Sequence, residues 1–260
     1  MARPRTLCLV AHYFGTPEDR IASYARCTDI LERPRRERIV KRTIAWLQRL
    51  STQLDLEIVV AGVRGKNILP LDIDYADQIK SHWHILWRLF ADAQRNFDDY
   101  DYLLVLEDDV LVPRRTIARM LAANHELTDK RHAIFPNRIE FFCGLPLNPD
   151  LVAMPGWTGQ RINWRSKTWY QATNPHSAIL FLGRHQSEEF RKVDFSWPRI
   201  TLGEYTTSAF ERAHSGYTLF REKSRIPSHF VVHQDGWIRR NFDRRGLGLI
   251  ARSYLVNYKY

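Results

Sequence analysis

Short apolar segments alternate with amphipathic segments in the first half of this chain, and this alternation narrows the possible folds more than any other feature. Residues 6–11, 56–61 and 102–113 read as buried strands, the last one interrupted by three acids. Between them, apolar residues recur every three or four positions over 39–54 and 77–97, which is helical spacing. Strands that alternate with helices form parallel βα units. We therefore predict an α/β protein with a mostly parallel central sheet flanked by helices.

The second half of the chain has a weaker pattern. Helices are predicted at 116–127, 187–193 and 204–216, and strands at 133–135, 177–182 and 230–233. Between 136 and 175 the periodicity disappears, and proline, glycine and tryptophan are frequent. Because proline and glycine interrupt regular structure, we expect an irregular region there.

The composition excludes several classes of protein. Of the 260 residues, 44% are hydrophobic and 12% aromatic, which is too apolar for a disordered chain. Three cysteines stand far apart without a CxxC pair, which argues against a disulfide framework and a zinc-thiolate site. No apolar run approaches the ~20 residues of a membrane span. We therefore expect a soluble, cytoplasmic protein.

The charge is strongly positive, with 39 Lys and Arg against 29 Asp and Glu and a net charge of +10. Such a field favours anionic ligands, namely nucleotides, nucleic acid or an acidic membrane surface. A peripheral contact with an anionic membrane is therefore one expected interaction. The basic runs at 33–36, 239–240 and 244–245 are typical of solvated faces, although the last two could also cover a bound anion.

Three consecutive acids, Glu107, Asp108 and Asp109, directly follow an apolar run. They must lie where a strand leaves the sheet, and open α/β sheets bind ligands at the carboxyl ends of their strands. Successive side chains of an extended segment point to opposite sides, so Glu107 and Asp109 are expected to converge. Converging carboxylates repel unless a cation lies between them, and a hard divalent ion is the simplest candidate. The alternative is a solvated turn whose acids cap the next helix.

The stretch from Asp101 to Leu121 resembles the DXD region of GT-A glycosyltransferases, in particular the inverting, family-2-like group, with Glu107 in place of the first Asp. The resemblance implies a Rossmann-like GT-A fold and a divalent metal, Mn²⁺ or Mg²⁺, that holds the diphosphate of a nucleotide-sugar. The preceding helix with Arg88 also matches the family's layout, and we assign donor-binding roles to Asp108 and Arg88. Arg239 and Arg240 are further donor-binding candidates, because they follow His233 closely and their charge would attract the diphosphate.

A later block, from Ser177 to Tyr217, is similar to the family's segment that runs through its "ED" motif. Where relatives have Glu-Asp, this chain has Glu204-Tyr205, so Tyr205 occupies the usual position of the base. We assign the catalytic base to Glu204 through a shift of one residue. An acid at the start of a helix is also favoured by the helix dipole alone, which is the alternative reading of Glu204.

The same resemblance extends to His233, because many metal-dependent GT-A enzymes supply a late histidine as a metal ligand. The proposed metal ligands are thus Glu107, Asp109 and His233. A histidine at the end of an apolar strand can also be a hydrogen-bonded core residue. The tryptophans of the irregular region could stack on an acceptor sugar or simply pack beneath a loop. The acceptor-binding candidates are Trp157, Trp164 and Trp169.

The resemblance covers about residues 6–235 and implies a hexosyltransferase that moves a sugar from a nucleotide-diphosphate donor to a glycan or other acceptor, as in polysaccharide biosynthesis. A UDP-sugar and inversion at the sugar are expected. We predict a catalytic domain over 1–236, with a donor half at about 1–135 and an acceptor half at about 136–236. A basic tail or flap follows over 237–260.

Two other functions remain open from the sequence. A metal-dependent nuclease or phosphotransferase would also use clustered carboxylates, although it has no reason to keep the late Glu204 block and His233 in this order. A basic nucleic-acid-binding protein would fit the charge. Nucleic acid is nevertheless not an expected partner, because no aromatic-interleaved basic stripe is present and three adjacent acids would repel phosphate.

Overall fold

A computed structural model describes most of the chain and divides it into two compact units. The described residues are 4–15, 33–75, 82–129, 131–142, 144–148, 157–172, 179–186, 190–192, 218–224 and 227–234. Unit 1 comprises Met1–Asp109 and Ala178–Gly216, and unit 2 comprises Val110–Ser177 and Tyr217–Tyr260. The predicted assignment of a donor half and an acceptor half stays a prediction.

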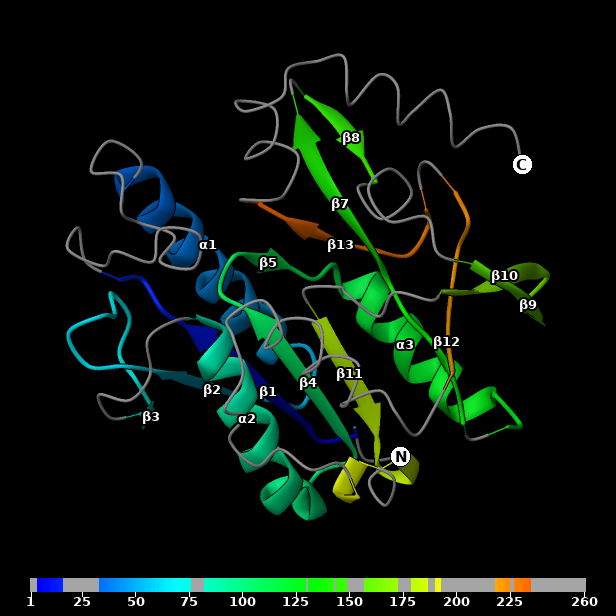
Figure 1. Cartoon of the computed structure of the whole chain (residues 1–260), viewed down its shortest axis with the longest axis horizontal. Helices are drawn as coiled ribbons and strands as arrows, with labels where there is room; N and C mark the ends of the chain where they lie inside the picture. The colour runs from blue at the N-terminus through cyan, green and yellow to red at the C-terminus, as the bar shows by residue number, and fades with distance from the viewer. Residues whose placement is uncertain are drawn as a thin grey trace. The chain divides into compact units, whose positions relative to one another are not determined.

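Unit 1 is built on a five-stranded sheet (Figure 1). Its strands, in the order in which they lie side by side, are β11 (Ile179–Gly183), β4 (Tyr102–Glu107), β1 (Thr6–His12), β2 (Leu56–Gly62) and β3 (Ile73–Asp74). The pairs that join β4, β1, β2 and β3 are parallel, whereas β11 runs antiparallel to β4. The predicted α/β class and mostly parallel central sheet are confirmed.

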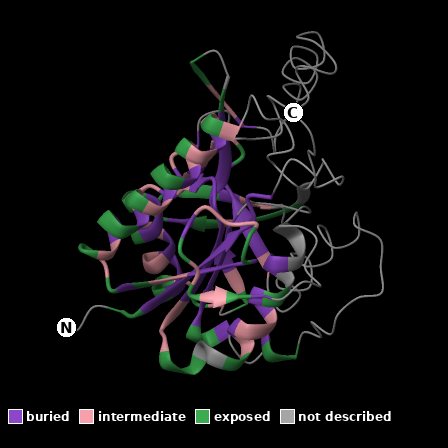
Figure 2. Cartoon of the chain, turned by 90° about the vertical axis from the view of Figure 1, so that its left-hand side faces the viewer, coloured by how far each residue is buried: buried purple, intermediate pink, exposed green. Residues whose placement is uncertain are grey.

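Two helices pack on this sheet. Helix α1 (Arg33–Ser51) packs against β2, and α2 (His82–Asn96) packs against β1, β2 and β4. A short 3-10 helix, η1 (Phe97–Asp99), follows α2, and another, η2 (Arg184–Gln186), follows β11. Every residue of β1 is buried, which explains the uninterrupted apolar run over 7–11. Figure 2 shows the same division, with buried strands inside and exposed residues on the outer sides of the helices.

The order of the strands creates a switch point. From β1 the chain adds β2 and β3 on one side, and then returns to place β4 on the other side of β1. Open α/β sheets bind ligands at the carboxyl ends of the two strands that flank such a reversal. In unit 1 these ends are His12 and Glu107, and Ala11 pairs with Glu107.

Gly62 is required at the neighbouring end of β2. A Cβ atom at this position would lie 2.5 Å from the carbonyl oxygen of His12 and 2.8 Å from a methyl group of Leu71. Such a contact with backbone cannot be relieved by moving a side chain. The absence of a side chain at residue 62 therefore lets β2 approach the end of β1 closely.

Unit 2 contains one described helix, α3 (Arg114–Glu126), and two four-stranded sheets. One sheet has the order β6 (His132–Ile134), β12 (Thr218–Arg221), β10 (Lys167–Ala172) and β9 (Trp157–Trp164). The other has the order β5 (Val110–Leu111), β13 (Phe230–His233), β7 (Asn137–Phe142) and β8 (Leu145–Leu147).

The structure corrects two predictions about secondary structure. The strand expected at 102–113 is divided into β4 and β5, because the chain turns at Asp108 and Asp109. The region expected to be irregular contains β7, β8, β9 and β10. Its strands pair mainly as antiparallel hairpins, and several of their buried residues are polar, so the sequence lacks a clear apolar period. The helix predicted at 204–216 and the tail at 237–260 lie outside the described residues. Among the described helices, none is both long and apolar enough to cross a membrane.

Candidate functional site

The three consecutive acids are buried at the carboxyl end of β4. Glu107 is the last residue of the strand, and Asp108 and Asp109 form the turn into β5. Their exposed fractions are 2%, 0% and 0%. Acidic side chains are almost never fully buried unless they are paired or bind a cation. The burial of this turn therefore argues against the solvated turn considered from the sequence.

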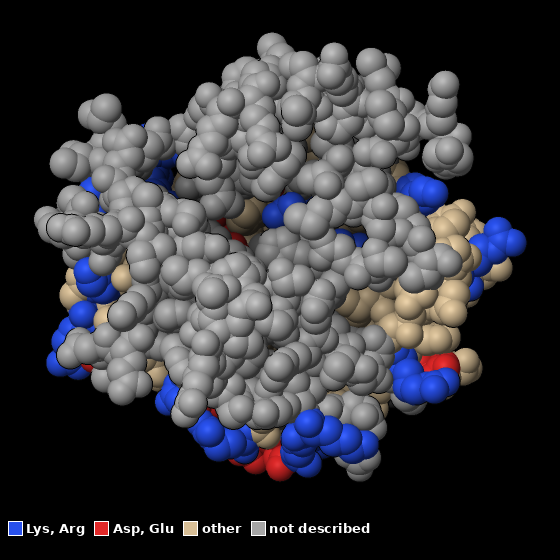
Figure 3. Space-filling view, viewed as in Figure 1, with Lys and Arg blue, Asp and Glu red and all other residues tan. Residues whose placement is uncertain are grey.

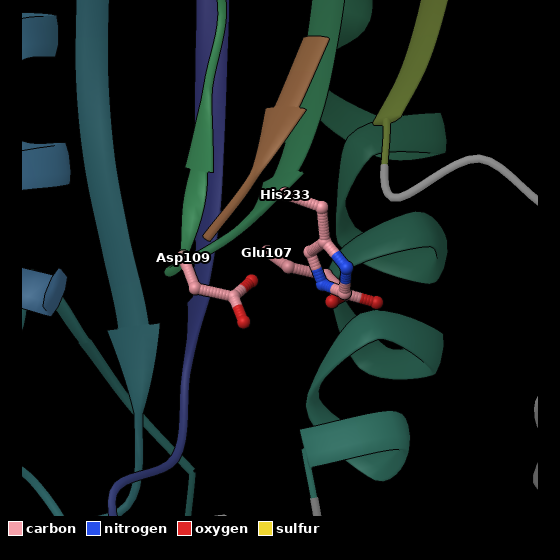
Figure 4. A group of neighbouring side chains, drawn as sticks. All are labelled: Glu107, Asp109 and His233. Atoms are coloured by element: carbon pink, nitrogen blue, oxygen red, sulfur yellow. The ribbon is translucent and has the colours of Figure 1, made fainter. Parts of the chain in front are cut away.

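Glu107 and Asp109 are grouped with His233. Each of the three buried side chains offers one potential ligand atom, and these atoms all lie within 4.8 Å of one another. His233 reaches the turn through β13, where it pairs with Val110, the residue that follows Asp109. Figure 4 shows the three side chains directed toward a common region. The structure thus brings together the three residues predicted from the sequence as metal ligands.

The donor set of this group fits a divalent cation. Two carboxylates and one imidazole can present oxygen and nitrogen ligands at 2.0–2.6 Å from an ion, and atoms within 4.8 Å of one another can share such an ion. Carboxylate oxygens suit Mg²⁺ and Mn²⁺, and the imidazole nitrogen suits the transition metals better. The chemistry of the three side chains is therefore compatible with Mn²⁺ and, with a weaker contribution from His233, with Mg²⁺.

Asp108 faces a different set of partners. Its Oδ1 accepts a hydrogen bond from Nη2 of Arg36, and its Oδ2 lies 2.8 Å from Nδ1 of His12. Arg36 also donates from Nη1 to Oδ2 of Asp109, at 2.7 Å. Both carboxylate oxygens of Asp108 thus bind side chains of unit 1, and its predicted contact with the donor stays a prediction.

His12 connects this turn to the loop after β2. The backbone N–H of Ile68 donates to Nε2 of His12, at 3.0 Å. Since Nε2 accepts, Nδ1 carries the ring proton and donates it to Asp108. Both nitrogens of this fully buried ring are therefore hydrogen-bonded.

In unit 2, Glu140 holds His233 from the other side of its ring. Oε1 of Glu140 lies 3.3 Å from Nδ1 of His233 and 3.6 Å from Nε of Arg138, and all three side chains are buried. Histidines that bind metal usually donate their second ring N–H to a carboxylate or carbonyl, which fixes the ring and its tautomer. Glu140 is placed to do this for His233.

Two of the tryptophans predicted to bind the acceptor belong to the core of unit 2. Trp169 has no exposed surface, and its Nε1 donates to the carbonyl oxygen of Trp164, at 3.2 Å. Trp164 is 7% exposed, and its Nε1 donates to Oε2 of Glu126, at 3.0 Å. Both rings pack with Ile134 and Phe220. The packing alternative is therefore correct for these residues, because neither ring has a free face for a sugar.

Among the other predicted site residues, the structure describes the side chain of Arg88. Arg88 is exposed on α2, and its guanidinium lies over the ring of Tyr75, 5.7 Å from the centroid. Trp157 begins β9, but its side chain is outside the description. Glu204, Arg239 and Arg240 lie outside the described residues, so their predicted roles as base and donor ligands stay predictions.

Sequence reasoning missed Arg36, His12 and Glu140. Arg36 belongs to a basic run that we interpreted as a solvated face, yet only 1% of its surface is exposed. A signal was present, because Arg36 precedes Val40, Thr43 and Leu47 at the spacing of the buried face of α1. His12 and Glu140 had no comparable signal, since the sequence does not reveal which strands bring them to the acids.

No protein-family model and no curated protein matches this chain. Among solved structures, it is similar to a glycosyltransferase involved in glycosylation of the major capsid of PBCV-1, with a TM-score of 0.35 and 13% identity over 89% of this chain and 82% of that chain. It is also similar to A197 from STIV, with a TM-score of 0.38 and 12% identity over 90% of this chain and 95% of that one.

A third similar structure is the mannose-1-phosphate geranyltransferase from Thermus thermophilus. Here the TM-score is 0.37 and the identity 13%, over 90% of this chain and 74% of that one. With TM-scores below 0.5, these similarities carry no argument about function. The function proposed below therefore depends on the site itself.

Proposed function

We propose that this protein is a metal-dependent glycosyltransferase of the GT-A type, which transfers a sugar from a nucleotide-diphosphate donor to a hydroxyl group of a glycan or other acceptor. The observation that carries the proposal is the buried group of Glu107, Asp109 and His233, whose potential ligand atoms lie within 4.8 Å of one another. UDP-sugars are the proposed donors.

The place of the acids in the sheet supports a nucleotide ligand. Glu107 ends β4, which lies beside β1 at the reversal of strand order in unit 1. Nucleotides bind outside the carboxyl ends of the strands at such a point in doubly wound sheets. The positive charge of the chain would also attract a diphosphate. On the face in Figure 3, Lys and Arg are visibly more abundant than Asp and Glu among the described residues.

Glu107, Asp109 and His233 would hold the divalent cation. When bound, this cation would neutralise charge on the diphosphate as its bond to the sugar breaks. Glu140 would keep the ring of His233 in one orientation, and Arg36 would hold Asp109. These contacts fix the ligands before a donor arrives, which is the condition for strong electrostatic stabilisation.

The remaining roles are proposed from the sequence. Glu204 would accept the proton of the acceptor hydroxyl as that oxygen attacks the sugar on the side opposite the leaving diphosphate, which inverts the anomeric carbon. Arg239 and Arg240 would contact the diphosphate. Of the three tryptophans, Trp157 stays an acceptor-binding candidate.

Thermal unfolding tests the donor class and the metal together. We expect Mn²⁺ with a UDP-sugar to raise the Tm of the wild type, because a ligand that binds only the folded state stabilises it by mass action. GDP- and CDP-sugars, each with and without Mn²⁺, serve as comparisons. The Glu107→Gln and Asp109→Asn variants should lose the Mn²⁺-dependent shift and the transfer or hydrolysis of the donor.

The control for these variants is Glu57→Gln, because Glu57 is an exposed acid of β2 that pairs with Arg5. It should keep the full shift. Equal stabilisation of all four proteins by the UDP-sugar in the presence of a chelator would contradict the metal site. Cleavage of nucleic acid without any stabilisation by sugar nucleotides would instead favour the nuclease alternative.

A further inference from the structure

Arg36 occupies an unusual place for an arginine. It lies on the buried face of α1 together with Val40, Thr43, Leu47 and Leu50, and has 1% of its surface exposed. Arginine is almost never fully buried unless its charge is paired. Moving the guanidinium charge of Arg36 from water to the buried face of α1 costs free energy that hydrophobic packing does not offset. The groups that contact this charge must therefore stabilise it.

The partners of Arg36 are the two consecutive carboxylates of Asp108 and Asp109. These residues, together with Glu107, are called the acid turn below. Nη1 donates to Oδ2 of Asp109, at 2.7 Å, and Nη2 donates to Oδ1 of Asp108. A guanidinium is a planar fork whose N–H groups have fixed directions. One fork that bridges two neighbouring residues fixes the orientation of one carboxylate relative to the other.

The second oxygen of Asp108 is held independently. His12 binds it at 2.8 Å and is itself fixed by the backbone N–H of Ile68. Asp108 therefore acts as an anchor, with Arg36 on one oxygen and His12 on the other. Arg36 links this anchor to Asp109, which lies two residues after Glu107, the last residue of β4.

We propose that Arg36 is a positioning residue of the metal centre, which holds Asp109 in the orientation that converges with Glu107. The inference rests on the proposed function, since it assumes that Glu107 and Asp109 bind a divalent cation. Arg36 also supplies a permanent positive charge beside the acids, which reduces their mutual repulsion before the cation binds. A residue of α1 that lies 73 positions from Asp109 in the sequence would thus contribute to the metal affinity.

Direct titration with Mn²⁺ tests this, with the free ion followed by electron paramagnetic resonance and no substrate present. We expect Arg36→Met to weaken Mn²⁺ binding by about 10–100-fold, the usual effect of removing a residue that orients a metal ligand. Arg36→Lys should lie between this variant and the wild type, because it keeps the charge but loses the bidentate geometry. Arg38→Met is the matched control, since Arg38 is exposed on the same helix, and it should bind like the wild type.

Circular dichroism identifies the variants that fold. If Arg36→Met does not fold, the Mn²⁺ affinity of Arg36→Lys tests the positioning role. A folded Arg36 variant with lowered Tm but Mn²⁺ affinity within about twofold of the wild type would overturn the positioning role, because a purely structural residue changes stability alone. Failure of the wild type to bind Mn²⁺ would overturn the proposed metal site and this inference together. Normal binding by the wild type and by all Arg36 variants would overturn only this inference.

Discussion

Each unit contains an arginine that binds carboxylate oxygens through two of its nitrogens, but the two pairs lie in opposite surroundings. In unit 1, Arg36 bridges Asp108 and Asp109, and all three side chains are at most 1% exposed. In unit 2, Arg165 binds Glu126 through Nε and Nη2, with side chains that are 49% and 38% exposed. The chemical groups are the same, so burial decides what each pair contributes.

Water explains the difference. The exposed pair in unit 2 exchanges contacts with water for contacts with each other, and such pairs contribute little to stability. The Arg165 guanidinium does lower the pKa of Glu126, yet the carboxylate stays ionised and solvated at neutral pH with or without it. In unit 1, water cannot replace either partner. Removal of Arg36 would leave buried charges without the cation that holds them.

The largest expected effect is therefore that of Arg36→Met on stability. We expect the free energy of unfolding to fall by about 3–5 kcal/mol, as measured by urea denaturation of the protein without metal. Arg38→Met, on the exposed face of the same helix, should leave the urea midpoint unchanged. A loss below about 1 kcal/mol for Arg36→Met would mean that the acid turn does not depend on its guanidinium.

A buried histidine of unit 2 extends the comparison of buried and exposed ion pairs to a buried group that is neutral. His229 in unit 2 has no exposed surface, and within the described chain neither of its ring nitrogens has a hydrogen-bond partner. The pKa of His229 is lowered to about 4, chiefly by burial; the charge of Glu222 opposes this effect, and the positive charges of Arg119, Lys167 and Arg115 add to it. The folded protein thus resists protonation of this ring, whereas the unfolded chain binds a proton near pH 6.5.

Below pH 6.5 the unfolded state binds more protons at this site, so stability should decrease as the pH falls. From pH 6.5 to 4, we expect His229 to account for a loss of about 3 kcal/mol in the free energy of unfolding. Urea denaturation at a series of pH values measures this, and His229→Gln should have a flatter profile in this range. Identical slopes for the two proteins would show that His229 is protonated in the folded state as easily as in the unfolded chain.

The smallest effect is expected for Arg165→Met. Because Glu126 keeps the hydrogen bond from Nε1 of Trp164, the substitution leaves no buried polar group without a partner. The urea midpoint should stay within the error of the measurement, at low salt and at high salt. A loss as large as that of Arg36→Met would contradict the view that burial separates the two pairs.

The sequence predicted the parts of the fold that are buried on both sides. β1 and β4 appear as apolar runs because apolar side chains cover both faces of a central parallel sheet. β7 was missed, since Asn137, Arg138 and Glu140 are buried on a strand through polar contacts rather than apolar packing. A pattern that depends on hydrophobicity cannot detect such a strand.

The candidate site was predictable to the same extent. Glu107 and Asp109 were predicted as ligands because acids directly after an apolar run are unusual in sequence, and His233 was predicted through the resemblance to the late histidine of metal-dependent GT-A enzymes. Their supporting residues were not, because Arg36, His12 and Glu140 reach them only through the pairing of distant elements. Trp164 and Trp169 misled for the opposite reason, since aromatic residues are enriched both in binding sites and in cores.

The link between His12 and residue 68 has a simple consequence for variation in the loop after β2. Because the contact uses a main-chain amide, it does not depend on which side chain residue 68 carries. Nineteen of the twenty common amino acids could supply that hydrogen, and only proline lacks it. The side chain at residue 68 can therefore vary while the hydrogen bond between the loop and the histidine persists.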